Sequence, residues 1–243
     1  GIASTDGLPR RRPERPAAIT ATRGNHGQSS ARAATAAGLS ATILVPKGNS
    51  VEKNAAMRAF GARLVEHGAD FDEAKAEAER LAVTERLTLV PSFHPDLVKG
   101  VATYALELFR AAPDLAAVYA PIGLGSGICG LITARDLLGL DTKIIGVVSE
   151  AAPGYALSFE AGHPVPTNSA RTFADGVAVR EPHPLAVEII NKGAAGIVRV
   201  SDDQVAEAMR ILFEDTHNVA EGAGAAALAA LIADRDKWRG RRV

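Results

Sequence analysis

Residues 116–130 read Ala-Ala-Val-Tyr-Ala-Pro-Ile-Gly-Leu-Gly-Ser-Gly-Ile-Cys-Gly, a short apolar run followed by a turn rich in glycine. The apolar run favours a buried strand, and the residues after the turn favour a helix. Glycines and a serine between a strand and a helix form a nest of backbone N–H groups that fits a phosphate. We therefore expect an anion site formed by Gly123, Leu124, Gly125, Ser126 and Gly127.

Two well-known phosphate motifs do not match this turn. No Lys-Ser/Thr pair follows the glycines, as it would in a Walker A loop, and the spacing Gly123-x-Gly125-x-Gly127 differs from the dinucleotide fingerprint G-x-G-x-x-G. A phosphate without adenosine contacts matches better, and a tight glycine turn that binds no ligand is the alternative. Cys129 is expected to pack as a small apolar residue.

Apolar runs of this kind recur along the chain and alternate with stretches of helical periodicity. Such alternation indicates an α/β fold with parallel-type sheets flanked by helices. In one helical stretch, Leu97, Val101, Tyr104 and Leu108 would share a face, and residues 201–204 form a capping box at the start of another. The predicted strands cover residues 18–22, 41–45, 62–65, 87–90, 116–120, 144–148 and 196–200.

The same alternation predicts two domains. Residues 17–112 hold four strand–helix pairs and form the smaller domain. Pro113 marks the seam, because proline is poorly tolerated within a continuing helix. Residues 113–243 form the larger domain, which is expected to be incomplete, and residues 1–16, rich in Gly, Pro and Arg, an exposed arm.

Composition narrows the class of protein. The chain has 243 residues and a net charge of -1, which gives no general attraction to nucleic acid or to an anionic membrane. A single cysteine excludes an intramolecular disulfide and fits a reducing compartment. No apolar run approaches the roughly 20 residues of a membrane span, and the N-terminus shows no secretory signal. We expect a cytoplasmic enzyme with no nucleic-acid partner and no membrane partner.

A second polar loop follows the first predicted strand, where residues 21–30 read Ala-Thr-Arg-Gly-Asn-His-Gly-Gln-Ser-Ser. In open parallel sheets, ligands collect at the carboxyl ends of the strands. Gly24 and Gly27 would let a ligand approach the main chain. Thr22, Asn25 and Gln28 add neutral donors that suit a carboxylate or a phenolic oxygen. The alternative is a simple helix N-cap with the histidine packed as a satisfied side chain.

Both loops resemble those of the fold-type II pyridoxal-phosphate enzymes, the tryptophan synthase β-like superfamily, in particular its threonine/serine dehydratase and serine racemase group. Residues 22–28 resemble the family's S-x-G-N-H-G/A-Q loop, and residues 123–130 resemble its G-G-G-G phosphate loop. Residues 172–179, Thr-Phe-Ala-Asp-Gly-Val-Ala-Val, are similar to T-x-A-D-G-x-A-V, and residues 221–225 to E-P/G-x-G-A. Four motifs in the family's order over nearly the whole chain make the resemblance specific.

The resemblance implies the cofactor pyridoxal 5'-phosphate and a small amino-acid substrate. Asn25 would hydrogen-bond the cofactor's ring oxygen, Glu221 would lie near its pyridine ring, and residues 123–127 would bind its phosphate. The ring would accept the charge left by loss of the substrate's α-proton. Loss of the β-hydroxyl would then give an enamine that hydrolyses to a keto acid and ammonia. Thr22 and the backbone of residues 24–26 would hold the carboxylate, and the substrate-binding residues would be Thr22, Arg23, Gly24, His26 and Gln28.

The family's Schiff-base lysine belongs to a motif like S-F-K-x-R-G, which would lie upstream of Gly1. The family's S-G-G-N turn would likewise follow Val243. We therefore expect a chain truncated at both ends, with no catalytic lysine of its own and little or no dehydratase activity. The seven lysines that are present are interpreted as surface charges: Lys47, Lys53, Lys75, Lys99, Lys143, Lys192 and Lys237.

Two departures from the family pattern affect the expected chemistry. Arg23 stands where serine racemases have a serine that acts as second acid or base, which disfavours racemisation and could suit a larger or more acidic substrate. Arg171 stands where cation-binding members have a glutamate, and the six histidines offer no ligand spacing, so no metal is expected.

The leading interpretation is a pyridoxal-phosphate-dependent dehydratase or ammonia-lyase of threonine, serine or a similar hydroxy amino acid. Relatives commonly form dimers, so a homodimer is expected. An amino-acid racemase or a β-replacing synthase of the same fold is the alternative enzyme. A non-catalytic phosphate-binding module is the alternative outside enzymes.

Overall fold

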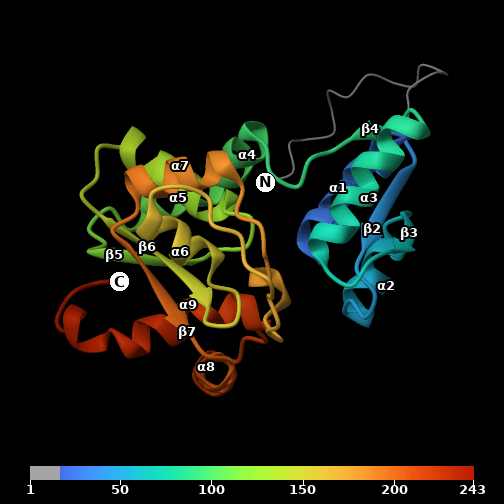
Figure 1. The fold of residues 1–243 in the computed structure, drawn as a ribbon. Helices are drawn as coiled ribbons and strands as arrows, with labels where there is room; N and C mark the ends of the chain where they lie inside the picture. Colours follow the sequence, from blue (N-terminus) through green and yellow to red (C-terminus); the bar gives the residue numbers. More distant parts are fainter. Residues whose placement is uncertain (1–16) are drawn as a thin grey trace. The chain divides into compact units, whose positions relative to one another are not determined.

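The computed structural model describes residues 17–243, which fall into two compact units with the boundary between Ser92 and Phe93 (Figure 1). The boundary was expected at Pro113, which lies one helix after the observed boundary. Helix α4 (Pro95–Ala111) belongs to the carboxyl-terminal unit because it packs on α5 (Ser126–Leu137) of that unit. The predicted arm, residues 1–16, lies outside the described residues.

The amino-terminal unit, residues 17–92, contains a parallel sheet in the order β3-β2-β1-β4. Helices α1 (Asn25–Ala36), α2 (Val51–Ala59) and α3 (Phe71–Thr84) connect its strands. Right-handed crossovers place α1 and α2 on one face of the sheet and α3 on the other. The strands are β1 (Ala18–Ala21), β2 (Ala41–Val45), β3 (Arg63–Glu66) and β4 (Thr88–Leu89).

The strand order reverses between β1 and β4, so the loop after β1 lies at the switch point of this sheet. Ligands of open α/β sheets bind at this place, beyond the carboxyl ends of the strands. Two side chains hold the end of β1 to the segment after β4. Thr20 Oγ1 donates to the Val90 carbonyl at 2.7 Å, and Ser92 Oγ donates to the Ala21 carbonyl at 2.7 Å. The polar loop found in the sequence therefore lies at the ligand-binding edge of its own sheet.

The carboxyl-terminal unit, residues 93–243, contains a parallel sheet in the order β5-β6-β7. Its strands are β5 (Ala117–Pro121), β6 (Lys143–Ser149) and β7 (Gly196–Val200). Besides α4 and α5, the unit contains α6 (Gly154–Ala161), the short 3₁₀ helix η2 (Asp175–Val177), α7 (Pro184–Gly193), α8 (Asp202–Thr216), α9 (Gly222–Ala233) and the 3₁₀ helix η3 (Arg235–Trp238).

Helices cover both faces of this second sheet, and successive residues of β6 point into the two cores on either side. Ile144 and Val148 join the core that contains α4, α5 and α7, whereas Val147 joins the core formed with α8 and α9 (Figure 1). Because both faces are buried, β6 is apolar along its length rather than alternating with polar residues. Each of the seven predicted strands is present, and the α/β class is confirmed.

The helix predicted around residues 97–108 is present as α4, but its buried face is shifted by one residue. Val98, Ala102, Ala105 and Phe109 are buried, whereas Tyr104 is 44% exposed. Two small residues cause the shift. A Cβ added at Gly130 of α5 would lie 3.1 Å from the Ala102 backbone nitrogen, so the two helices approach closely at this point. The predicted face of Leu97, Val101, Tyr104 and Leu108 is therefore wrong in register.

The capping box expected at residues 201–204 is confirmed at the start of α8. Gln204 N donates to Ser201 Oγ at 3.2 Å, and Ser201 N donates to Gln204 Oε1 at 2.9 Å. Two unpaired N–H groups of the helix start are thereby satisfied. Among residues 17–243, no helix combines the length and apolar composition that crossing a membrane requires.

Candidate functional site

The glycine turn predicted to bind phosphate joins the carboxyl end of β5 to α5. Gly125 is the N-cap of α5 and has a positive φ of 98°, a conformation that favours glycine. No side chain caps this helix. The turn contains no charged residue, so an anion would be held by N–H groups and by the positive end of the helix dipole.

Close packing behind the turn explains why it needs glycines. A Cβ added at Gly123 would overlap the carbonyl oxygen of Gly176, and one added at Gly125 would lie 2.9 Å from the Ala186 Cβ. Gly127 differs, because its nearest neighbour there would be the Tyr104 hydroxyl at 3.8 Å. The first two glycines therefore let the turn pack against the protein, and the third leaves space beside the helix start.

Buried Tyr155 of α6 holds the turn in place. Its hydroxyl donates to the Leu124 carbonyl at 2.7 Å and accepts from the His183 N–H at 3.0 Å. From α4, the Tyr104 hydroxyl donates to the Gly127 carbonyl at 3.3 Å. These two tyrosines were missed in the sequence because each bonds a backbone group far along the chain, which no local pattern reveals. The bonds hold the turn at the Leu124 and Gly127 carbonyls.

Three of the four family-like motifs come together in this unit. A Cβ added at Gly176 would lie 2.7 Å from the Ala223 Cβ and 3.7 Å from Glu221 Oε1. Gly176 also lies against Gly123, as described above, so it separates the glycine turn from the start of α9. The phosphate turn, the residues around η2 and the Glu221 segment thus form one continuous cluster.

The polar loop after β1 is organised by Thr22, which is buried. Its Oγ1 accepts hydrogen bonds from Gly24 N at 2.9 Å and Gly27 N at 3.3 Å. No side chain caps α1, which begins at Asn25. Because the Gly24 N–H is already bonded to Thr22, the donors left for a carboxylate are the N–H groups of Asn25 and His26. The Asn25 side chain is exposed and Gln28 is half-buried.

His26 is held in one tautomer by its neighbours. Thr20 Oγ1 donates its proton to Val90, so it accepts from His26 Nε2, which lies 2.9 Å away. Burial lowers the pKa of His26 below its ordinary value of 6.5, opposed by a weaker effect of the Val90 carbonyl. The imidazole is therefore neutral near pH 7, with the proton on Nε2.

Gly27 has a different role from the one expected. A Cβ added at Gly27 would overlap Thr22 Cγ2 and lie 2.5 Å from Met57 Sδ, so the glycine faces the protein interior. It permits α1 to pack on β2 and α2, and the prediction that it opens the main chain to a ligand is not supported by its position. Gly24 faces the Lys53 side chain, whose Nζ would lie 3.5 Å from an added Cβ.

Arg23 contains an unpaired buried donor. Its Nε is buried and has no hydrogen-bond partner among the described residues. A buried guanidinium N–H without an acceptor costs about 1–3 kcal/mol or more, so such groups commonly mark a place where a ligand or water binds. The Arg23 Nε–H has no acceptor among the described residues.

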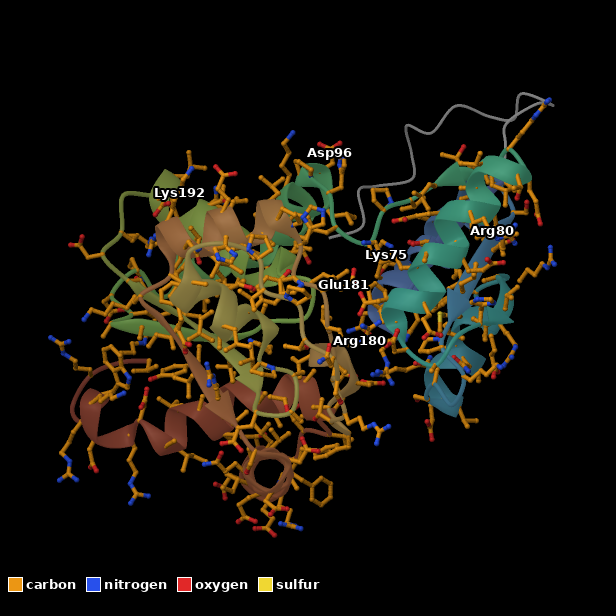
Figure 2. The ribbon with its side chains drawn as sticks, in the orientation of Figure 1. Lys75, Arg80, Asp96, Arg180, Glu181 and Lys192 are labelled. Atoms are coloured by element: carbon orange, nitrogen blue, oxygen red, sulfur yellow. The ribbon has the colours of Figure 1, made fainter. Side chains whose placement is uncertain are left out.

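The lysines are mostly surface charges, as expected, but two are half-buried. The half-buried lysines are Lys53 and Lys75, and Lys53 lies beside Gly24 of the polar loop. Lys192 extends from the outer face of α7 and pairs with Glu188 at 2.6 Å (Figure 2). The exposed lysines are Lys47, Lys99, Lys143, Lys192 and Lys237.

These donors fit the phosphate and ring oxygen of pyridoxal phosphate. The glycine turn offers uncapped N–H groups and no acidic side chain to repel a phosphate. The start of α1 offers an exposed amide and further uncapped N–H groups. Within residues 17–243, no group of three or more His, Cys, Asp or Glu side chains is placed to hold a metal ion.

Comparison with known proteins yields a consistent set of similarities. Residues 7–243 match the family described as "Pyridoxal-phosphate dependent enzyme". The biosynthetic L-threonine dehydratase IlvA of Salmonella typhimurium is 38% identical over 214 residues, which cover 88% of this chain and 42% of that protein. The processed threonine deaminase isoform 2 of Solanum lycopersicum has a similar structure, with a TM-score of 0.86, 32% identity and coverage of 99% of this chain and 69% of that one.

A structure of a pyridoxal 5'-phosphate-dependent aspartate racemase is also similar, with a TM-score of 0.85 and 28% identity. The similarity covers 92% of this chain and 69% of that chain. The chain spans about half the length of most of these curated relatives, for example 42% of the Salmonella protein and 56% of an L-threonine ammonia-lyase of Thermotoga maritima.

Proposed function

Because this chain belongs to the pyridoxal-phosphate-dependent enzymes, we propose that it forms the cofactor- and substrate-binding part of a lyase for hydroxy amino acids. The substrate would be threonine, serine or a similar hydroxy amino acid, which would lose its α-hydrogen and β-hydroxyl and end as a keto acid and ammonia. The observation that carries the proposal is the cluster of the glycine turn, Gly176 and Glu221 in the carboxyl-terminal unit. Similarity to threonine dehydratases supports the substrate class.

Each proposed residue has a separate task. The N–H groups of residues 123–127 would bind the phosphate, Asn25 would donate to the ring oxygen, and Glu221 would lie near the pyridine ring. Thr22 and the N–H groups of Asn25 and His26 bind the substrate carboxylate. When bound, pyridoxal phosphate supplies an electron-accepting ring that makes the substrate's α-hydrogen acidic. Neutral His26 adds no positive charge to the loop, so the carboxylate is held by hydrogen bonds rather than by a nearby imidazolium.

The phosphate assignment is tested by comparing pyridoxal phosphate with pyridoxal, which lacks the phosphate. We expect the chain to bind pyridoxal phosphate at least tenfold more tightly, as measured by equilibrium dialysis. Ser126→Asp should remove this preference, because its carboxylate repels the phosphate while an acid in the first turn still favours the helix. Ser201→Asp, which places the same charge at the start of α8, is the matched control and should bind as the parent does.

Equal binding of the two compounds by the parent chain would refute the phosphate site. Circular dichroism of Ser126→Asp shows whether the variant is folded, and a folded variant that keeps the phosphate preference would also refute it.

We further propose that this chain alone does not turn over threonine or serine, because none of its lysines lies in a motif like the family's S-F-K-x-R-G. Sodium borohydride should therefore fix no cofactor to a defined lysine, as measured by mass spectrometry of peptides, and no keto acid should form. Cofactor trapped on one lysine together with turnover would contradict the proposal. Lys53 is the residue to examine first, since it lies beside the polar loop, and Lys53→Arg is the variant that would identify it.

Arg23 refines the substrate class within this proposal. Its unpaired Nε favours a hydroxy amino acid with an additional acceptor, such as a second carboxylate. We expect 3-hydroxyaspartate to change the absorbance of cofactor added to the chain at lower concentration than threonine does. Arg23→Ala should abolish this difference, and Arg32→Ala, an exposed arginine of α1, should not. Equal responses to both amino acids in the parent chain would restrict the substrate to the monocarboxylates.

An amino-acid racemase is the second candidate, favoured by the similarity to the aspartate racemase structure. A β-replacing synthase of the same fold and a non-catalytic phosphate-binding module complete the alternatives. Chiral chromatography of the recovered amino acid, together with measurement of keto acid, distinguishes the lyase from the racemase. Formation of the D-amino acid without keto acid would replace the lyase by a racemase.

A further inference from the structure

A pocket of about 410 Å³ lies in the carboxyl-terminal unit, away from the glycine turn. Lys143 opens β6 and Gly196 opens β7, so the pocket lies at the amino ends of these strands, whereas the glycine turn follows the carboxyl end of β5. The residues that follow α9 form its other wall. Its volume is within the range of small-molecule sites.

Three cations and one acid line this pocket, and the acid is already neutralised. Asp234 pairs with Lys237 at 2.6 Å and accepts from the Tyr119 hydroxyl at 2.8 Å. These partners outweigh desolvation and lower the pKa of Asp234, so it stays ionised near pH 7. The other two cations, Lys143 and Arg241, form no ion pair within residues 17–243. The pocket therefore has a positive charge that the described residues do not neutralise.

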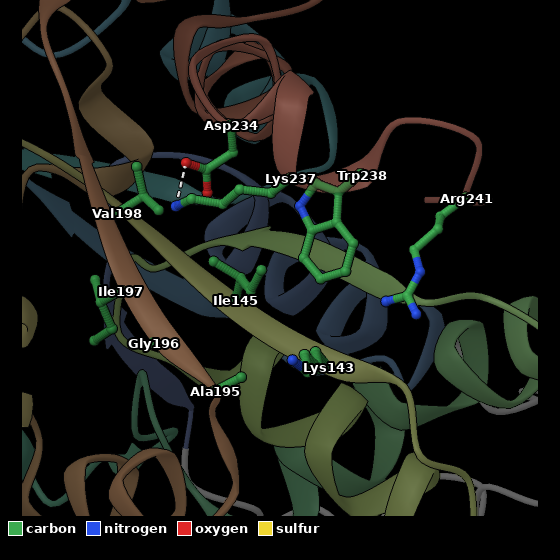
Figure 3. Close-up of a pocket in the computed structure, with 10 residues that line it drawn as sticks. All are labelled: Lys143, Ile145, Ala195, Gly196, Ile197, Val198, Asp234, Lys237, Trp238 and Arg241. Atoms are coloured by element: carbon green, nitrogen blue, oxygen red, sulfur yellow. Dashed lines mark ion pairs between the residues drawn. The ribbon is translucent and has the colours of Figure 1, made fainter.

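Trp238 lies between the cations and the apolar residues of the pocket and contacts both. Its Nε1 donates to the Tyr119 hydroxyl at 2.7 Å, which fixes the indole. The Lys143 Nζ lies 6.0 Å from the ring centroid, a distance at which a cation is attracted by the ring face. Figure 3 shows the guanidinium of Arg241, from the segment after η3, beside the indole, with Lys143 of β6 below the ring.

The remaining wall is apolar. Ile145 and Val198 line it beside the indole ring. An inorganic anion would meet the two cations but leave this wall in contact with water. An organic carboxylate would satisfy both, because its charged group would lie between Lys143 and Arg241 while its carbon chain covered the apolar residues.

We propose that this pocket binds a small organic carboxylate with a short apolar chain, at a site separate from the proposed cofactor and substrate residues. Binding places the negative charge between two like charges that otherwise repel each other, which stabilises the segment that follows η3. Because Trp238 is the only tryptophan of the chain, its fluorescence reports on this pocket directly.

The test is a fluorescence titration of the 243-residue chain at constant ionic strength. Butyrate should produce a saturable change, whereas butyramide, its neutral counterpart, and inorganic phosphate should not. Lys143→Met and Arg241→Gln should each weaken the apparent affinity for butyrate at least fivefold. Arg239→Gln is the matched control, because Arg239 belongs to the same segment but pairs with Asp236 outside the pocket, and it should titrate as the parent does.

Three results would overturn the proposal. A response to butyrate that stays linear and never saturates would show that no site exists. A response to phosphate as strong as that to butyrate would exclude an organic ligand. Folded Lys143→Met and Arg241→Gln variants with the affinity of the parent would show that the cations do not bind the carboxylate, and circular dichroism establishes that the variants are folded.

Discussion

The hydroxyl of Thr22 shows how one side chain can shape a whole loop. It accepts from two backbone N–H groups, those of Gly24 and Gly27, in a buried position. Removing a buried acceptor leaves its donors unsatisfied and costs more than the hydrogen bond itself contributes. The sequence pattern indicated Thr22 as a ligand contact, whereas the structure adds that the hydroxyl determines the loop's conformation.

We expect Thr22→Val to destabilise the amino-terminal unit by about 1–3 kcal/mol, because the Gly24 N–H loses its acceptor and the Gly27 N–H keeps only the Gly24 carbonyl. Thr22→Ser keeps the hydroxyl and should cost less. Hydrogen exchange of peptides from β1 and β2 measures the effect. Thr84→Val, at an exposed position of α3, is the control and should stay within about 0.5 kcal/mol of the parent. A Thr22→Val variant as stable as this control would show that water replaces the hydroxyl.

His26 should make the stability of the same unit depend on pH. Burial lowers its pKa from 6.5 in the folded protein, so the unfolded chain binds a proton more readily. Stability is therefore complete above about pH 7 and is lost as the pH falls below the unfolded value. Hydrogen exchange at pH 5, 6 and 7 should show this loss in the parent and a flatter profile in His26→Gln. His94→Gln, at an exposed histidine, should retain the parent's profile, and an identical slope in both variants would contradict the assignment.

Residue roles were only partly predictable from the sequence. Gly125 was correctly placed at a turn, and its positive φ agrees with the expectation that glycine is needed there. Cys129 packs as a buried apolar residue, as expected. Gly27 was assigned to ligand approach, yet its neighbours are Met57 of α2 and Thr22, and the contact with Met57 could not be identified without the fold. The two tyrosines that hold the glycine turn were invisible for the same reason.

Elements were predicted more reliably than residue roles, because their periodicity is local. The strand β2 and the strand β7 were predicted with their observed ends, and α8 begins at the predicted capping box. The register of α4 was missed, since large apolar side chains suggested a face that includes Tyr104. The actual face is set by Ala102, which allows close contact with Gly130. Small residues contribute little to a hydrophobic pattern, so this contact could not be read from it.

The contact between α4 and α5 can be tested with two glycines. Gly130→Ala should destabilise the carboxyl-terminal unit by about 1–3 kcal/mol, because its Cβ would lie 3.1 Å from the Ala102 nitrogen and force the helices apart. Gly100→Ala in α4 meets no atom within 4 Å and should be neutral or stabilise by up to about 1 kcal/mol, as alanine favours the helix. Urea unfolding followed by Trp238 fluorescence measures both. Equal stabilities would show that the contact tolerates an added methyl group.

At the scale of the whole molecule, the fold class and the presence of two units were predictable, but the boundary between them was not. Pro113 ends α4, as a proline signal should, but the chain changes units before α4 begins. A proline marks the end of a helix and contains no information about the neighbours on which that helix packs. The polar loop and the glycine turn could each be placed after a strand, because each follows an apolar run of its own sheet.

The homodimer and the cytoplasmic location remain predictions. Light scattering should give about twice the monomer mass of 25.2 kDa at micromolar concentration. A mass that stays at the monomer value as the concentration is raised would contradict the homodimer.

Cys129 provides a way to observe opening of the carboxyl-terminal unit without any engineered label. It is the only thiol of the chain, it is fully buried, and burial raises its pKa to about 12. A thiol reagent can therefore react only when the packing between α5 and its neighbours separates. The rate of modification of the native protein in excess reagent thus measures how often this unit opens, and a ligand that stabilises the unit should slow the reaction in proportion to its occupancy.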